Sequence, residues 1–327
     1  MRKEKRGKRI LLVSAVLALV MVMIYSGLQI LEATVFYTVP VQQEVKRKTI
    51  ERNGIEYFPR QDLTTILVMG IDEEGPVAAT ESYRNSGEAD MLALVILDQS
   101  GGNYRILCLN RDLMVEMPVL GIGGKEAGSF FGQLALSHTY GSGVEDSAEN
   151  TRKAVSDFLY GVKIDHYVAL NMDAIPVLND AVGGVTVEVT DDFSRVDSSI
   201  RRGTMTLMGE QSLRFVRTRK DVGTELNLSR MGRQQEYMKG LAAALEAGID
   251  SSDTFVAEVY EQLEPYMVTD CSVQVVSGLL QRCADYPMAE NLTIPGQNVR
   301  GAEFYEFYAD EEKTDELILR LFYEEKE

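Results

Sequence analysis

A cluster of arginines in the second half of the chain is its most unusual local feature. Residues 195–239 hold ten basic and five acidic side chains, although the whole 327-residue chain has a net charge of −17. Arginine suits phosphate because its planar guanidinium donates two parallel hydrogen bonds. Arg217 and Arg219 point to the same face if their segment is extended. Arg230 and Gln234, four residues apart, share one face of a helix.

This spacing predicts a pocket for a multiply charged group such as a pyrophosphate. A solvated basic surface is the alternative, since charge runs usually lie on the surface. Asp72, Asp90 and Arg111 each lie close to the end of an apolar, strand-like run. Strand ends are the usual place for ligand-binding residues in sheets flanked by helices. Two carboxylates beside a pyrophosphate would suit Mg²⁺, which takes carboxylate and phosphate oxygens.

The chain alternates between strand-like and helix-like segments. Apolar runs without polar alternation predict strands at 64–69, 91–97, 104–109, 165–170 and 185–189. Helical spacing predicts helices at 147–160, 173–181, 209–217, 228–247, 253–263 and 272–283, with loops at 75–87 and 118–128. Buried strands alternating with helices predict an α/β fold, a layered α-β-α domain with a central mixed sheet.

The N-terminus has the pattern of a membrane anchor. Six basic residues and one acidic residue occupy the first nine positions, and residues 10–31 follow without a charge. A helix needs about 20 apolar residues to cross a bilayer, and the positive-inside rule places this N-terminus in the cytoplasm. A cleaved signal peptide is the alternative, but it needs a shorter apolar run and a small-residue cleavage site. The acidic remainder, expected outside the cell, argues against nucleic-acid binding.

The chain has only three cysteines and two histidines, which limits the possible disulfides and metal sites. Cys271 and Cys283 could pair outside the cell or remain free thiols. Their spacing matches no zinc ligand set, so the sequence does not favour zinc. His138 and His166 are expected to be structural.

Several segments together resemble the LytR-CpsA-Psr family of enzymes that attach anionic glycopolymers to bacterial cell wall. They are TTILVMGID, EADMLALVILD, LCLNRDLMVEMP, LALSHTYGSG, KIDHYVALNMDAIPVLNDAVGGVTVEV and GEQSLRFVRTRK followed by SRMGRQQ. The expected organisation is a cytoplasmic tail (1–9), a transmembrane helix (10–31), an extracellular stalk (32–61), a catalytic domain (62–300) and an acidic C-terminal helix (301–327).

The resemblance implies transfer of a glycopolymer, with one phosphate, from a polyprenyl pyrophosphate to a peptidoglycan hydroxyl. It assigns Mg²⁺, or alternatively Mn²⁺, to Asp72 and Asp90, and catalytic roles to Asp90, Arg111 and Arg219. The residues that it assigns to the pyrophosphate are Arg111, Arg217, Arg219, Arg230 and Gln234. The lipid is expected in an apolar tunnel between the sheet and the helices.

The chain departs from the family pattern beside these residues. Glu88 occupies a position where the family usually has an arginine, two residues before Asp90, unless Arg84 takes that role. Asn110 and Asn227 stand where the family tends to have proline and aspartate. These differences keep two alternatives open: a non-catalytic module that binds polyprenyl pyrophosphate or wall polymer, and a lipid-pyrophosphate hydrolase. A transcriptional regulator is a further alternative, opposed by the outward topology and the acidic charge.

Overall fold

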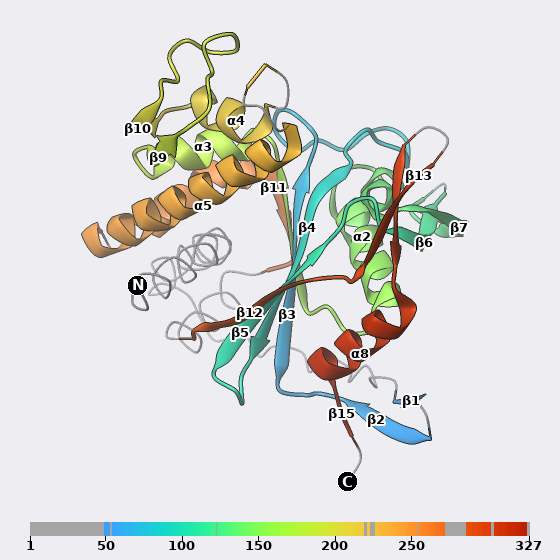
Figure 1. The fold of residues 1–327 in the computed structure, drawn as a ribbon. Coiled ribbons are helices and arrows are strands. Elements are labelled where there is room, and N and C mark those ends of the chain that lie inside the picture. The colour runs from blue at the N-terminus through green and yellow to red at the C-terminus, as the bar shows by residue number, and fades with distance from the viewer. Residues whose placement is uncertain are drawn as a thin grey trace, which may run out of the picture.

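A six-stranded mixed sheet lies at the centre of the computed structural model (Figure 1). The structure describes residues 49–52, 54–121, 123–218, 221–222, 226–252, 254–271, 286–301 and 304–325. In spatial order the strands are β11 (Met267–Thr269), β8 (His166–Asn171), β3 (Leu63–Ile71), β4 (Ala89–Asp98), β5 (Asn103–Leu109) and β12 (Met288–Thr293). The β3 strand pairs antiparallel with β4 and parallel with β8. The mixed α/β fold with a central mixed sheet, predicted from the sequence, is confirmed.

Both faces of the sheet are buried, because the apolar runs leave neither face polar. Ile66 and Val68 of β3 join one hydrophobic core, and Leu67 and Met69 join the other. The first core is covered by α3 (Ala174–Ala181), α4 (Glu210–Arg217), α5 (Leu226–Ser251) and α6 (Phe255–Leu263). The second is covered by the 3₁₀ helix η2 (Leu134–Thr139), α2 (Glu145–Phe158) and α8 (Glu311–Phe322). Helices therefore pack on both sides of the sheet (Figure 1).

Smaller sheets and one short helix complete the described chain. They are β1 (Ile50–Arg52), β2 (Ile55–Pro59) and β15 (Tyr323–Glu325); β6 (Met114–Leu120) and β7 (Glu126–Gln133); β9 (Val185–Val189) and β10 (Gly203–Leu207); β13 (Gly296–Arg300) and β14 (Tyr305–Ala309); and the 3₁₀ helix η3 (Glu264–Tyr266).

Two of these pairings differ from the sequence prediction. The expected loop 118–128 belongs to a hairpin in which β6 pairs with β7, with a register shift between Val119 and Leu120. Its glycines indicate a loop locally, but pairing between the strands supplies the hydrogen bonds of the flanking residues. Residues 50–52 and 55–59, assigned to the stalk, form β1 and β2, and β15 pairs with β2. This pairing joins the two ends of the described chain, which local sequence cannot reveal.

Several predicted features lie outside the described residues. They are the transmembrane segment 10–31, the helix 272–283, and the side chains of Arg219, Arg230 and Cys283. Among the helices that the structure describes, none has the length and apolar character needed to span a bilayer.

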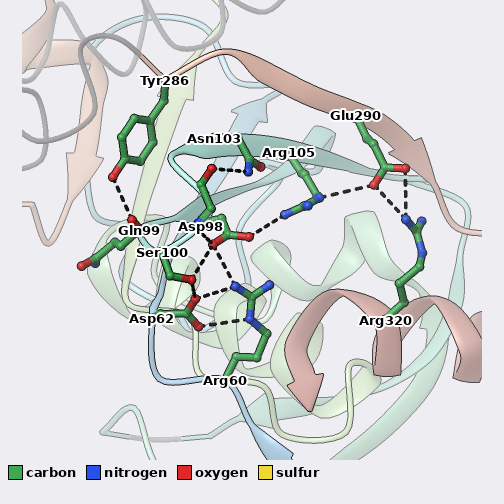
Figure 2. Close-up of polar contacts among 11 residues, drawn as sticks. Arg60, Asp62, Asp98, Gln99, Ser100, Asn103, Arg105, Tyr286, Glu290 and Arg320 are labelled. Carbon is green, nitrogen blue, oxygen red and sulfur yellow. Dashed lines mark hydrogen bonds and ion pairs between the residues drawn. The ribbon is translucent and has the colours of Figure 1, made fainter. Parts of the chain in front are cut away.

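A charged network joins the end of the sheet where β3 begins to the C-terminal part of the chain (Figure 2). Asp98, whose side chain is 5% exposed, accepts hydrogen bonds from Arg60 at 2.8 Å and Arg105 at 3.0 Å. Glu290 of β12 joins Arg105 at 3.3 Å to Arg320 of α8 at 2.8 Å. Burial alone would raise the pKa of Asp98, but hydrogen bonds from Arg60, the Gly101 N–H and Arg105 lower it below its usual range.

We expect Asp98→Asn to lower the free energy of unfolding by about 3 kcal/mol, because it removes the buried carboxylate that joins Arg60 to Arg105. Equilibrium urea unfolding measures this loss. Asp157→Asn is the control, since Asp157 pairs with Lys153 on the surface of α2 and both side chains are 51% exposed. Its cost should stay below about 0.5 kcal/mol. Equal effects of the two substitutions would contradict the importance of the buried network.

Candidate active site

The strand pairing brings the predicted acidic residues to one edge of the sheet. The end of β3, the start of β4 and the end of β5 coincide because these strands are antiparallel. Asp72 follows β3, Asp90 lies at the start of β4 and Arg111 follows β5. The backbone N–H of Asp72 donates a hydrogen bond of 2.8 Å to the carbonyl of Glu88, which fixes the two segments together. Three predicted site residues therefore share this edge.

Arg111 is surrounded by carboxylates. Its Nη1 contacts Asp90 Oδ1, its Nη2 lies 2.7 Å from Glu88 Oε2, and its Nε lies 3.5 Å from Asp112 Oδ1. Burial lowers the pKa of Arg111, but the charges of Asp90, Glu88 and Asp112 outweigh this effect and raise it above its usual value. Glu88 stands where the family resemblance leads one to expect an arginine. It contacts Arg111, a residue predicted to bind phosphate. Arg84 lies over the ring of Tyr140, at 5.5 Å from its centroid.

Arg217 connects the arginine cluster to the same edge. It is the last residue of α4, and its Nη2 lies 3.0 Å from Asp72 Oδ1. Its Nη1 lies 3.1 Å from Glu74 Oε1. The guanidinium is 45% exposed and so accessible to a ligand in solution. The structure therefore places Asp72, Asp90, Arg111 and Arg217 at one edge of the sheet.

Arg233 is a positioning residue that the sequence analysis did not single out. Its guanidinium is 4% exposed, and it donates to Phe215 O at 2.8 Å and to Thr218 O. Asp191 Oδ2 lies 2.5 Å from its Nη1. These bonds satisfy carbonyls at and just beyond the end of α4, where the carbonyls of a helix generally lack intrahelical partners. Arg233 thereby holds the segment that carries Arg217.

Helical spacing in the sequence could not show that Arg233, rather than Arg230 or Gln234, is the buried residue. Arg233 lies three residues after Arg230 and next to Gln234, so all three occupy one broad side of a helix. Gln234 is exposed, and its Nε2 donates to Val216 O at 3.3 Å. Gln234 therefore also supports the end of α4, whereas the side chain of Arg230 lies outside the described residues.

The loop before β4 is held by the half-buried Asn85 and the buried His138. Asn85 donates to the carbonyls of His138 and Gly141, each at 2.9 Å, and its Oδ1 accepts from Gly87 N at 2.7 Å. His138 Nδ1 lies 2.9 Å from Gly87 O, so this nitrogen donates. Both contacts fix the backbone directly before Glu88. Burial lowers the pKa of His138 to about 4, against the opposing effect of the Gly87 carbonyl.

We expect His138 to weaken the fold in acid. The unfolded chain binds a proton at this side chain below about pH 6.5, whereas the folded chain resists it down to about pH 4. Above pH 6.5 the side chain has no effect on the free energy of unfolding, and by pH 4 it has lowered this free energy by about 3 kcal/mol. His138→Asn, which can still donate to Gly87, should reduce the pH dependence of the free energy of unfolding in this window. Identical pH profiles for the two proteins would contradict this role.

The described part of the edge is rich in negative charge. Five carboxylates, those of Asp72, Glu74, Glu88, Asp90 and Asp112, contact two guanidinia. This arrangement repels a phosphate unless further positive charge joins it. The hard oxygen donors of Asp72 and Asp90 are of the kind that Mg²⁺ takes together with phosphate oxygens. The donor set therefore fits a magnesium ion.

The fold and its charged edge define an α/β protein of the kind that binds ligands at strand ends. The chain belongs to the LytR_cpsA_psr family, whose model matches residues 24–321. It is 26% identical to the polyisoprenyl-teichoic acid–peptidoglycan teichoic acid transferase TagU of Bacillus anthracis (strain CDC 684 / NRRL 3495), over 84% of each chain. The TagU of Bacillus licheniformis (strain ATCC 14580) is 23% identical over 98% of each. Crystalline B. subtilis TagV shares the fold, with a TM-score of 0.57 and 24% identity over 80% of this chain and 96% of that one.

Proposed function

We propose that this protein is a membrane-anchored phosphotransferase. It moves a glycopolymer, with one phosphate, from a polyprenyl pyrophosphate carrier to a peptidoglycan hydroxyl. The observation that carries the proposal is the meeting of Asp72, Asp90, Arg111 and Arg217 at one sheet edge in a fold of this family. The teichoic acid transferases among its relatives support the same reaction class.

The proposed reaction requires mainly charge neutralisation and positioning, as is general for phosphoryl transfer. The acceptor hydroxyl oxygen forms a bond to the phosphorus that carries the glycopolymer, and the bond from this phosphorus to the polyprenyl phosphate oxygen breaks. Asp90, oriented by Arg111, receives the hydroxyl proton. Arg217, Arg219 and Arg230 bind the phosphates, and polyprenyl phosphate leaves. The lipid chain lies in a tunnel between sheet and helices.

A metal ion belongs to this proposal. Mg²⁺, or Mn²⁺ with similar oxygen ligands, would be held by Asp72 and Asp90 and would offset the excess of carboxylates. It would neutralise charge on the phosphates when bound. Residues 1–9 would lie in the cytoplasm and residues 10–31 in the membrane, with the catalytic domain outside the cell.

We expect Arg217→Ala to lower the transfer rate by at least about 100-fold, because it removes a donor to the developing phosphate charge. The assay contains the full-length chain in detergent, a polyprenyl-pyrophosphate-linked sugar, Mg²⁺ and peptidoglycan fragments. Release of polyprenyl phosphate and transfer of the sugar are followed together. Arg219→Ala and Asp90→Ala should have effects as large as that of Arg217→Ala.

Arg214→Ala is the matched control for Arg217→Ala. Arg214 lies one helical turn earlier on α4, where it pairs with Asp197 at 2.7 Å and is 49% exposed. This variant should keep the activity of the unmodified chain. Full activity of both Arg217→Ala and Asp90→Ala would refute the phosphotransferase. Release of polyprenyl phosphate without sugar on peptidoglycan would indicate the hydrolase instead.

The Glu88–Arg111 ion pair supports one other candidate, a binding module that holds the lipid pyrophosphate without transfer. Glu88 accepts from a guanidinium that would otherwise face the phosphates. We expect Glu88→Gln to raise the affinity for the lipid pyrophosphate about tenfold, because one phosphate-repelling charge disappears. A binding titration measures this change. Tight binding without turnover in both the unmodified chain and Glu88→Arg would favour the binding module.

A further inference from the structure

Three potential metal ligands meet at the end of the sheet opposite to the candidate active site. A ligand atom of His166, of Asp270 and of Cys271 all lie within 4.8 Å of one another. His166 begins β8 and pairs with Ile66 in the parallel register, whereas Asn171 at the other end of β8 pairs with Ile71, next to the active site. At about 3.3 Å per residue, five residues place the two sites roughly 16 Å apart along the strands.

Strand pairing explains why these residues meet. β11 runs antiparallel to β8, with Thr269 opposite Val168. Continuing this register beyond β11 places Cys271 opposite His166, at the separation of a cross-strand pair. The hydroxyl of Thr269 donates to Tyr167 O at 2.7 Å and accepts from the Cys271 N–H at 3.1 Å. The backbone therefore holds the thiol and the imidazole side by side.

The separation of the His166 imidazole from Asp270 suits two ligands of one metal ion as well as an ion pair. His166 Nδ1 is a buried atom that has no hydrogen-bond partner among the described residues. It lies 3.5 Å from Asp270 Oδ1. Two ligands of a tetrahedral zinc ion, each about 2.1 Å from the metal, are about 3.4 Å apart. The separation of these two atoms therefore leaves room for a metal ion between them.

The surroundings orient Asp270. Its Oδ1 accepts a hydrogen bond of 2.8 Å from the Tyr167 N–H, in the manner of the outer-shell bonds that fix metal ligands. Arg152 of α2 lies 3.7 Å from its Oδ2, and Glu149 forms an ion pair with the same arginine. A cation at the site thus faces an arginine whose charge is already compensated.

We propose that His166, Asp270 and Cys271 form a binding site for a divalent transition metal of the zinc class. One nitrogen, one oxygen and one sulfur ligand suit zinc better than Mg²⁺, which prefers oxygen. Three protein ligands leave the fourth position to water. The ion joins the edge strand β11 to β8 and stabilises this end of the sheet. This site is independent of the proposed transfer reaction, so either can fail without the other.

The test is a titration of the reduced, chelator-treated full-length chain with Co²⁺, a spectroscopic substitute for Zn²⁺. We expect a thiolate-to-cobalt charge-transfer band and visible bands typical of tetrahedral cobalt that saturate at one equivalent, and Zn²⁺ to abolish them. Cys271→Ser should remove the charge-transfer band. Asp270→Asn should weaken Co²⁺ binding at least about tenfold, since even outer-shell changes cost that much.

Cys108→Ser is the matched control. Cys108 is a partly buried thiol on β5, where it lies 3.6 Å from Asn291, and this variant should keep the band. Circular dichroism verifies that each variant is folded. Absence of the charge-transfer band in the unmodified chain, or its persistence in Cys271→Ser, would overturn the proposal. So would a disulfide between Cys271 and Cys283 that persists under the reducing conditions of the titration.

Discussion

The candidate active site depends on the antiparallel pairing of β3 with β4 and of β4 with β5. This pairing places the end of β3, the start of β4 and the end of β5 at one edge. Asp72, Asp90 and Arg111 come from segments up to 39 residues apart, yet they share this edge without any special loop. A shift of one residue in either pairing would turn every side chain of the shifted strand to the opposite face. The buried apolar residues on both faces prevent such a shift.

Charge balance is the second constraint on this site. The carboxylates of the described edge outnumber its guanidinia by five to two. Phosphate binding at such an edge requires more positive charge, from a metal ion, from Arg219 and Arg230, or from both. Glu88 strengthens this requirement because it contacts Arg111 directly.

Two buried charged groups hold the frame around the site. Arg233 satisfies carbonyls at the end of α4 and so positions Arg217, while Asp98 joins the far end of the sheet to α8 through a chain of ion pairs. Each is nearly excluded from solvent, so each needs its complete set of partners. Neither touches the candidate ligand position. Their role is to fix the position of the end of α4, which carries Arg217, relative to the strands of the central sheet.

The sequence by itself determined the strands at the centre of the sheet, most of the helices and the residues at the strand ends. These follow from local apolar runs and helical spacing, and the family resemblance agrees with them. Only the tertiary structure decided which side chains pair. The contacts of Arg111 with Glu88 and of Arg217 with Asp72, the role of Arg233 and the pairing of β11, β12 and β15 all join residues distant in sequence. The meeting of His166 with Cys271, 105 residues later, is the clearest case, because strand register, rather than any spacing motif, brings them together.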